Sequence, residues 1–169
     1  LSLAGTYFSQ ATQKYTSEYE GFYRAEELFL KQEFSSAKFE FEAFLNSCKN
    51  NNDPFFVKAR YYSGLSTLNL NHDDEAIRLF MQFNKDYPEN IYKNDIYFKL
   101  GNYYFSKQNK KDTKKWFEKV IASDLNASEK DEYYFKHGYN FHLLNENTKA
   151  KTTFINAKEN KTKFGYASK

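Results

Sequence analysis

The sequence predicts an all-α fold, a solenoid of about four stacked helix pairs, and three observations support this prediction. The 169 residues include only two prolines and six glycines, which favours helices over short strands with tight turns. Apolar residues recur at helical spacing, as in Tyr97, Leu100 and Tyr104. The chain also contains an internal repeat of 37 residues, and periods of roughly 20–50 residues indicate stacked supersecondary units.

The repeat is marked by single glycines within helical patterns. Gly64, Gly101 and Gly138 lie 37 residues apart. Three further columns repeat at the same interval: Ala76, Thr113 and Ala150; Phe80, Phe117 and Phe154; Phe83, Val120 and Ala157. An earlier copy, 39 residues upstream of the second, consists of Ala25, Ala37, Phe41 and Phe44.

Each copy of the repeat reads as two helices joined by a polar turn, for example at residues 106–112 or 144–149. A glycine inside a helix costs roughly 1 kcal/mol relative to alanine, so packing must offset this cost. We expect the missing side chain to let two helices approach closely and to make room for a phenylalanine of the neighbouring helix. These glycines are therefore predicted to be structural.

This pattern resembles the tetratricopeptide repeat (TPR) family, most closely in the second copy at Gly64, Ala76, Phe80, Phe83 and Pro88. The chain departs from the family pattern at four positions: Gly21, Arg60, Thr67 and Thr113. The resemblance implies a right-handed superhelical solenoid over residues 18–160. It also implies a protein or peptide partner, bound in a concave groove that the first helices of successive repeats line.

The two ends of the sequence lie outside the repeats. Residues 1–17 are interpreted either as an N-terminal arm or as the remnant of a signal peptide, and residues 161–169 as the start of a further repeat or a tail. TPR proteins of bacterial cell envelopes have similar long repeats. We therefore expect a periplasmic or cell-envelope protein of a bacterium, with the cytoplasm as the alternative.

The sequence shows no pattern that supports catalysis, and we predict a protein that is not an enzyme and needs no cofactor. His72 lies in a turn, while His137 and His142 are five residues apart, so they do not share a helical face as metal ligands would. Cys48 is the only cysteine and has no histidine beside it. No glycine-rich phosphate loop is present.

The charge and hydropathy of the chain argue against two further features, a nucleic-acid-binding surface and a membrane-spanning helix. The net charge of +3 is small, and the basic stretch 107–115 reads as a solvated turn, so we expect no nucleic-acid partner. No apolar run approaches the roughly 18–20 residues that a membrane-spanning helix needs.

The resemblance also implies which residues face the groove, and we expect about half of its aromatic side chains to pack between helices instead. A TPR subset that binds chaperone termini uses lysine, asparagine and arginine, but Phe22, Glu26, Tyr62 and Asp95 occupy four of those positions and only Lys99 fits. The predicted partner-binding groove consists of Tyr61, Leu65, Phe98, Lys99, Asn102, Phe105, Phe135, Tyr139 and His142.

These observations predict a non-enzymatic scaffold that binds a partner segment in an aromatic groove. Two alternatives use the same residues. The repeats could form a structural spacer or self-associating module within a longer protein, or a regulatory module that binds a small molecule or a glycan. The identity of the partner and the oligomeric state are not encoded in any recognisable pattern.

Overall fold

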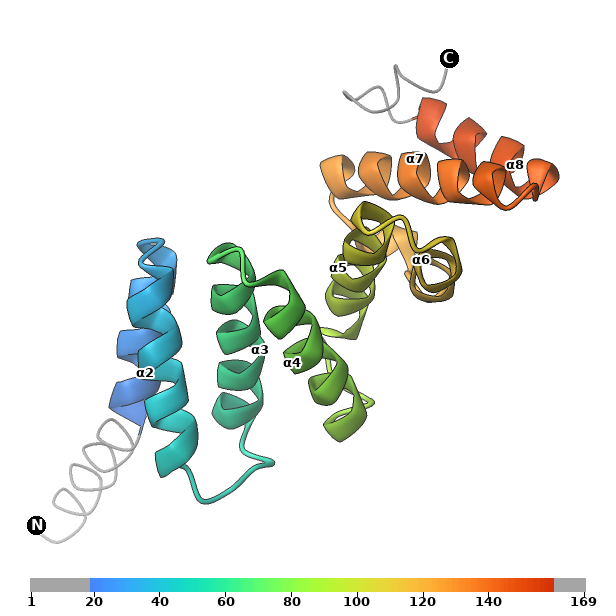
Figure 1. Cartoon of the computed structure of the whole chain (residues 1–169). Helices are drawn as coiled ribbons and strands as arrows, with labels where there is room; N and C mark the ends of the chain where they lie inside the picture. The colour runs from blue at the N-terminus through green and yellow to red at the C-terminus, as the bar shows by residue number, and fades with distance from the viewer. Residues whose placement is uncertain (1–18, 160–169) are drawn as a thin grey trace, which may run out of the picture. The chain divides into compact units, whose positions relative to one another are not determined.

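Helices are the only regular secondary structure in residues 19–159, which are the residues that the computed structural model describes (Figure 1). These residues belong to two compact units, and the division between the units falls after Asp86. The all-α prediction is confirmed. The segments 1–17 and 161–169, each with two interpretations above, lie outside the described residues. Within the described range, no helix has the length and apolar character that crossing a membrane requires.

Unit 1 contains two helix pairs. The first pair consists of helical residues 19–30 and α2 (Phe34–Ser47), and the second of α3 (Pro54–Asn69) and α4 (Asp73–Asp86). Asp53 caps α3, because its carboxylate accepts a hydrogen bond of 2.7 Å from the Phe55 amide. The core between the first pair and α3 consists of Phe22, Ala25, Ala37, Phe41, Phe44 and Ala59.

Unit 2 also contains two helix pairs, α5 (Lys93–Ser106) with α6 (Lys110–Phe117), and α7 (Ala127–Leu143) with α8 (Asn147–Glu159). The second helix of its first pair, α6, is short. The remaining residues of the 37-residue repeat form the connection from α6 to α7, which contains the 3₁₀ helix η1 (Ala122–Asp124).

Side chains hold the connection between α6 and α7 in place at both of its ends. The Asn94 amide group donates to the Ile121 carbonyl at 3.1 Å and accepts from the Ile121 amide at 2.7 Å. At the far end, Asn126 and Glu129 form a reciprocal capping box that starts α7. The connection therefore positions α7 against α6, where the candidate site described below is built.

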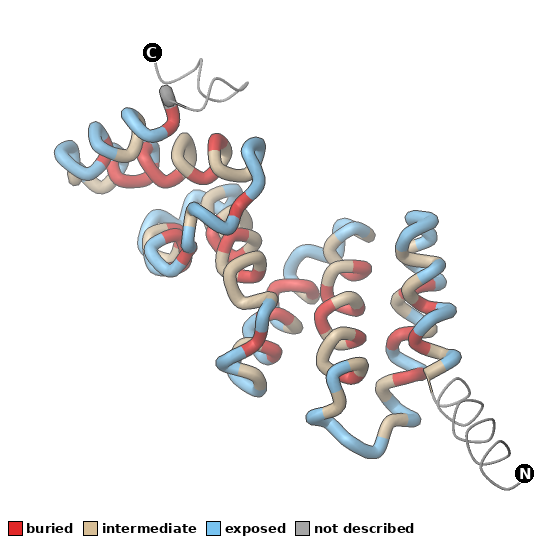
Figure 2. The backbone as a smooth tube through the Cα atoms, turned by 180° about the vertical axis from the view of Figure 1, so that it is seen from behind, coloured by how far each residue is buried: buried red, intermediate tan, exposed pale blue. Residues whose placement is uncertain are grey.

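The repeated glycines face phenylalanine rings, as the sequence predicts. A Cβ atom added to Gly64 would lie 2.7 Å from the Phe80 ring, and one added to Gly138 would lie 2.8 Å from the Phe154 ring. At Gly101 the Phe117 ring comes closer still. Buried residues accordingly lie on the helix faces that turn toward their partners (Figure 2). The glycine of each pair makes the space that the ring fills.

A second periodic feature of the fold lies in the turn inside each helix pair. One residue of each turn has a positive φ between 57° and 62°, and its backbone N–H donates to the carbonyl three residues earlier. The next N–H donates to the carbonyl five residues earlier, which is the Schellman arrangement that satisfies the last carbonyls of a helix. The four residues are Gln32, Asn71, Gln108 and Asn145.

Three departures from the family pattern are satisfied locally. Thr67 and Thr113 are fully buried, and each hydroxyl donates 2.8 Å to a backbone carbonyl one turn earlier, of Ser63 and Asn109. Arg60 pairs with Asp86 at 2.6 Å. The structure shortens both predicted turns: α6 already begins at Lys110 and α8 at Asn147, so residues 106–112 and 144–149 are only partly turn, and most of the basic stretch 107–115 is helical.

We predict that Gly101→Ala destabilises unit 2 by about 1–2 kcal/mol. Overpacking a core costs typically 1–3 kcal/mol, and the gain in helix propensity recovers up to about 1 kcal/mol. Urea unfolding followed by the fluorescence of Trp116, the only tryptophan, measures this loss. Gly21→Ala is the matched control, because its Cβ would lie 3.8 Å from Phe44 in ordinary contact. An unchanged midpoint for Gly101→Ala would contradict the packing role.

We also predict that Gln32→Gly stabilises the chain by about 0.5–1 kcal/mol. Glycine removes the cost of the left-handed conformation, which exceeds the conformational entropy that glycine loses on folding. Asn71→Gly is the control and should change stability less, since asparagine tolerates this conformation better than glutamine. Thermal unfolding followed by circular dichroism measures both variants. A destabilised Gln32→Gly would show that the side chain matters more than the backbone strain.

Candidate functional site

One lysine, Lys136, connects α5 and α7 on a shared face of unit 2. The Lys136 ammonium, from α7, donates 2.9 Å to the Asn102 side-chain oxygen of α5 and pairs with Glu132 at 2.5 Å. It also lies 5.6 Å from the centre of the Phe105 ring. These contacts hold α5 and α7 in register and fix the ring of Phe105 from one side.

Three aromatic side chains form a continuous row on this face. The rings of Phe105 and Tyr139 meet edge to face at 6.2 Å, and Phe135 stacks parallel to Tyr139 at 6.4 Å. Tyr139 is 42% exposed, and His142 lies 6.5 Å from its ring. An exposed aromatic side chain supported by two others is a surface that can bury an apolar group of a partner.

A pocket of about 440 Å³ opens beside this aromatic row. Phe105 and Tyr139 form part of its wall, so the row and the pocket are one site. Its volume falls within the roughly 300–1,000 Å³ that is typical of ligand pockets. We call it the unit 2 pocket, and it is lined by Phe105, Gln108, Lys110, Thr113, Tyr139, Asn140 and Leu143.

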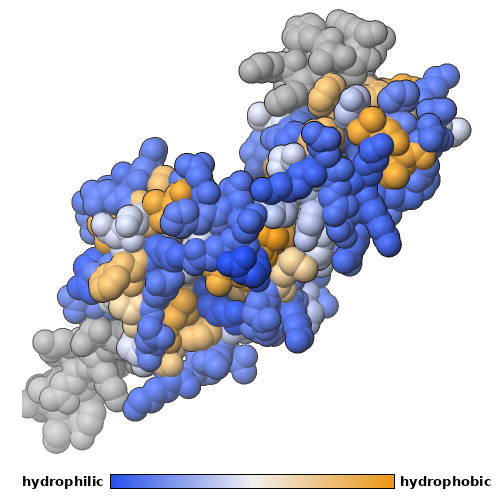
Figure 3. Space-filling model, viewed as in Figure 1, coloured by the Kyte–Doolittle hydropathy of each residue, from blue (hydrophilic) through white to orange (hydrophobic). Residues whose placement is uncertain are grey.

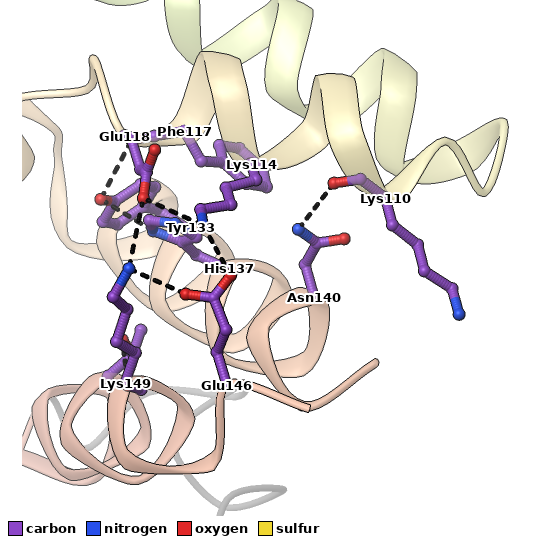
Figure 4. Close-up of polar contacts among 10 residues, drawn as sticks. Lys110, Lys114, Phe117, Glu118, Tyr133, His137, Asn140, Glu146 and Lys149 are labelled. Carbon is purple, nitrogen blue, oxygen red and sulfur yellow. Dashed lines mark hydrogen bonds and ion pairs between the residues drawn. The ribbon is translucent and has the colours of Figure 1, made fainter. Parts of the chain in front are cut away.

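Hydrogen bonds hold the polar wall of the unit 2 pocket in place. The Asn140 side chain donates 3.0 Å to the backbone carbonyl of Lys110, which ties α7 to the start of α6 (Figure 4). The Lys110 ammonium donates 3.3 Å to the carbonyl of Leu143, the last residue of α7. A cation at a helix C-terminus is favourable because of the helix dipole.

A buried histidine of unit 2 lies between α6 and α7. The Tyr133 hydroxyl is 3.2 Å from the Phe117 carbonyl, to which it donates, so its oxygen accepts from Nδ1 of His137 at 3.1 Å. The imidazole stacks on Phe141 at 4.2 Å. Its Nε2 atom is buried without a hydrogen-bond partner among the described residues. This arrangement suits the neutral imidazole and not the imidazolium.

An ion network spans α6 and α8 beside this histidine (Figure 4). Glu146 pairs with Lys114 at 2.5 Å and with Lys149 at 2.8 Å, and Glu118 lies within 3.9 Å of both lysines. Burial, and then the two lysine charges, lower the pKa of His137 to about 4. The hydrogen bonds from Lys114 and Lys149 lower the pKa of Glu146.

The structure divides the predicted groove residues between surface and core. Tyr61 and Phe98 are buried, and they pack on Phe80 and Phe117 within their own units. Lys99 pairs with Asp95 at 2.5 Å. Leu65, on α3 of unit 1, is half-buried. The predicted residues that unit 2 brings together on its α5 and α7 face are Asn102, Phe105, Phe135, Tyr139 and His142.

The sequence analysis missed five residues of the unit 2 pocket, because they do not lie on the groove-facing positions of a first helix. Gln108 lies in a turn and Leu143 ends α7, whereas Asn140 reaches from α7 to the start of α6. The sequence signal that was available for Gln108 is its position in the repeat, which it shares with Gln32, Asn71 and Asn145. The other two missed residues are Lys110 and Thr113.

In residues 19–159, no group of three or more histidine, cysteine, aspartate or glutamate side chains is placed to hold a metal ion. Cys48 caps the end of α2 as an unpaired thiol. The unit 2 pocket offers aromatic rings, one ammonium group and two amide side chains.

We predict that the stability of unit 2 falls as the pH is lowered from 6.5 to 4. The unfolded imidazole of His137 binds a proton below its ordinary pKa of about 6.5, whereas the folded one does so only near pH 4. Unfolding therefore takes up a proton in this window, and stability falls by up to about 3 kcal/mol. Urea unfolding at several pH values, followed by Trp116 fluorescence, measures the slope.

The variant His137→Phe keeps an aromatic ring against Phe141 and removes the titrating group. Glu118, Glu146 and the two lysines remain, so their own pH dependence cancels in the comparison. We expect the slope between pH 6.5 and 4 to decrease in the variant. Equal slopes for the two proteins would show that His137 is not responsible.

Comparison with known proteins agrees with this fold. A model of the tetratricopeptide repeat family matches residues 58–90, which cover most of the second helix pair. A crystal structure of a tetratricopeptide repeat protein from Parabacteroides merdae ATCC 43184 superposes with a TM-score of 0.69 at 15% identity, over 90% of this chain and 57% of that one.

The chain thus spans little more than half the length of this structural neighbour. No curated protein matches it. The matched segment is the helix pair that carries Gly64, Ala76 and Phe80, and the same columns recur in the two pairs that follow it. Residues 58–90 therefore match the tetratricopeptide repeat family, and the fold of the chain is that of a tetratricopeptide repeat protein.

Proposed function

We propose that this chain is a non-enzymatic interaction module whose unit 2 pocket binds an extended segment of a partner protein. Repeats of this family generally mediate protein–protein interactions and are generally not enzymes. The single observation that supports the finer proposal is the exposed ring of Tyr139 beside a pocket of about 440 Å³. In this proposal, one apolar side chain of the segment enters the pocket.

The aromatic row supplies the energy of binding in this proposal. Phe105 and Phe135 hold Tyr139 between them, so its ring loses little conformational freedom when a partner binds. Exposed aromatic anchors of this kind are typical hot spots, where one truncation costs more than about 1 kcal/mol. Elsewhere, the visible surface of the chain is mostly hydrophilic with scattered apolar patches (Figure 3).

Hydrogen bonds between helices preform the site in the absence of a partner. Lys136 joins α5 to α7 through Asn102, and Asn140 joins α7 to α6 through the Lys110 carbonyl. A preformed site binds more tightly, because less ordering accompanies association. We retain a bacterial cell envelope as the proposed location, because the long repeat resembles those of bacterial cell-envelope proteins of this family.

The volume of the unit 2 pocket also suits a small molecule, which keeps a ligand-binding regulatory module as the second candidate. A thermal-shift screen of metabolites and glycans separates the two candidates. A ligand at 100 times its dissociation constant stabilises a protein by about 2.7 kcal/mol. A small molecule with this effect, abolished by Tyr139→Ala, would replace the peptide proposal.

The peptide proposal is tested by selecting binders from a random library of displayed 12-residue peptides on the immobilised chain. We predict that the selected peptides bind Tyr139→Ala at least about tenfold more weakly than the wild type, which corresponds to about 1.4 kcal/mol. Fluorescence polarisation of the labelled peptides measures these affinities. Circular dichroism and Trp116 fluorescence verify that each variant is folded.

Tyr23→Ala is the matched control for this test. Tyr23 is 49% exposed, similar to Tyr139, and it also packs on two phenylalanines, Phe22 and Phe55, but it belongs to unit 1. Its removal should change the affinity by less than about twofold. Peptides that bind Tyr139→Ala as tightly as the wild type would rule out the unit 2 pocket as their site.

A further inference from the structure

The lining of the unit 2 pocket has one ionisable group that is charged at neutral pH. Of its seven lining residues, only Lys110 carries a charge, and none is acidic. The remaining polar groups are partly engaged: the Thr113 hydroxyl donates to Asn109, and the Asn140 amide donates to the backbone of Lys110. The pocket therefore combines apolar and neutral polar side chains with a single positive charge at its wall.

Lys110 differs from Lys99, Lys114 and Lys136 in what it contacts. Lys99, Lys114 and Lys136 each form an ion pair with a carboxylate at 2.5 Å. Within the described residues Lys110 has no such pair, and its ammonium contacts only the Leu143 carbonyl at 3.3 Å. A lysine carries three donors, so this contact leaves donors for a ligand.

We propose that the unit 2 pocket selects partner segments that carry an aspartate or glutamate within about two residues of the apolar anchor, and that Lys110 binds this carboxylate. This inference rests on the proposed function, whose anchor site it makes specific. The argument is charge complementarity: a positive group without a carboxylate partner among the described residues lines a pocket that has no negative charge.

The position of Lys110 suits this role. Its backbone is fixed, because its carbonyl accepts the hydrogen bond from Asn140 at 3.0 Å (Figure 4). Its side chain extends away from the ion network of α6 and α8, so Glu118 and Glu146 do not neutralise it. A charge-assisted bond from ammonium to carboxylate is stronger than the present bond to a neutral carbonyl.

The test uses the full chain and the same random library of 12-residue peptides, selected in parallel on the wild type and on Lys110→Glu. The peptides are displayed through their C-terminus, so no terminal carboxylate is available and any acidic preference comes from side chains. Deep sequencing counts aspartate and glutamate within two residues of an aromatic or large aliphatic residue. We expect at least threefold enrichment on the wild type and none on Lys110→Glu.

Lys111→Glu is the matched control. It makes the same change of charge one residue further along α6, at an exposed lysine that does not line the pocket. We expect the acidic preference to survive in this variant. Equal loss in both variants would overturn the inference, because the preference would then reflect the overall charge of α6 and not Lys110.

Measured affinities complete the test. For a selected peptide, replacing its acidic residue with the matching amide should weaken binding to the wild type about tenfold and to Lys110→Gln by less than about twofold. Trp116 fluorescence verifies that both lysine variants are folded. Selected peptides that depend on Tyr139 but show no acidic preference would overturn this inference and leave the proposed function intact. Peptides that do not depend on Tyr139 would overturn both.

Discussion

The contact between a small residue and a phenylalanine ring inside each helix pair is the constraint on which the rest of the structure depends. Gly64, Gly101 and Gly138 each face the phenylalanine that follows sixteen residues later, and no side chain fits between them without displacing the ring. This contact sets how closely the two helices of a pair approach. It recurs at an interval of 37 residues in the three pairs that carry these glycines.

The candidate site is a consequence of this regularity in unit 2. Because α6 packs closely on α5, its first turn lies near the end of α7, where Asn140 reaches the Lys110 carbonyl. The pocket lies where a turn, the start of one helix and the end of another meet. About one turn further along α6, Phe117 contacts His137, and Lys114 pairs with Glu146, which holds α7 and α8 to α6. The binding face and the packing face are therefore supported by different side chains.

The sequence predicts the helix pairs, their spacing and the packing role of the glycines, because these follow from patterns along the chain. The sequence does not show that Tyr61 and Phe98 are buried, since groove-facing and core-facing positions both favour aromatic residues. The turn residue Gln108 was missed because glutamine is a poor marker of positive φ, whereas Asn71 and Asn145 in the same column are better ones.

Only two of the seven residues that line the unit 2 pocket could be predicted from the sequence. Phe105 and Tyr139 occupy groove positions of first helices, which a repeat pattern identifies. Lys110 and Asn140 contribute through contacts between neighbouring pairs, about thirty residues apart, and such contacts depend on the three-dimensional packing of helices. The short length of α6 and the 3₁₀ connection after it also determine this packing, and no single residue encodes them.

The most direct test of the central claim is a nuclear magnetic resonance titration of the isotope-labelled chain with the blocked dipeptide N-acetyl-Asp-Phe-amide. If the unit 2 pocket accepts an apolar side chain, the largest shift changes will centre on the amides of Phe105, Gln108, Tyr139 and Leu143. Largest changes in unit 1, for example around the exposed Tyr23, or changes spread evenly over the surface would contradict the account.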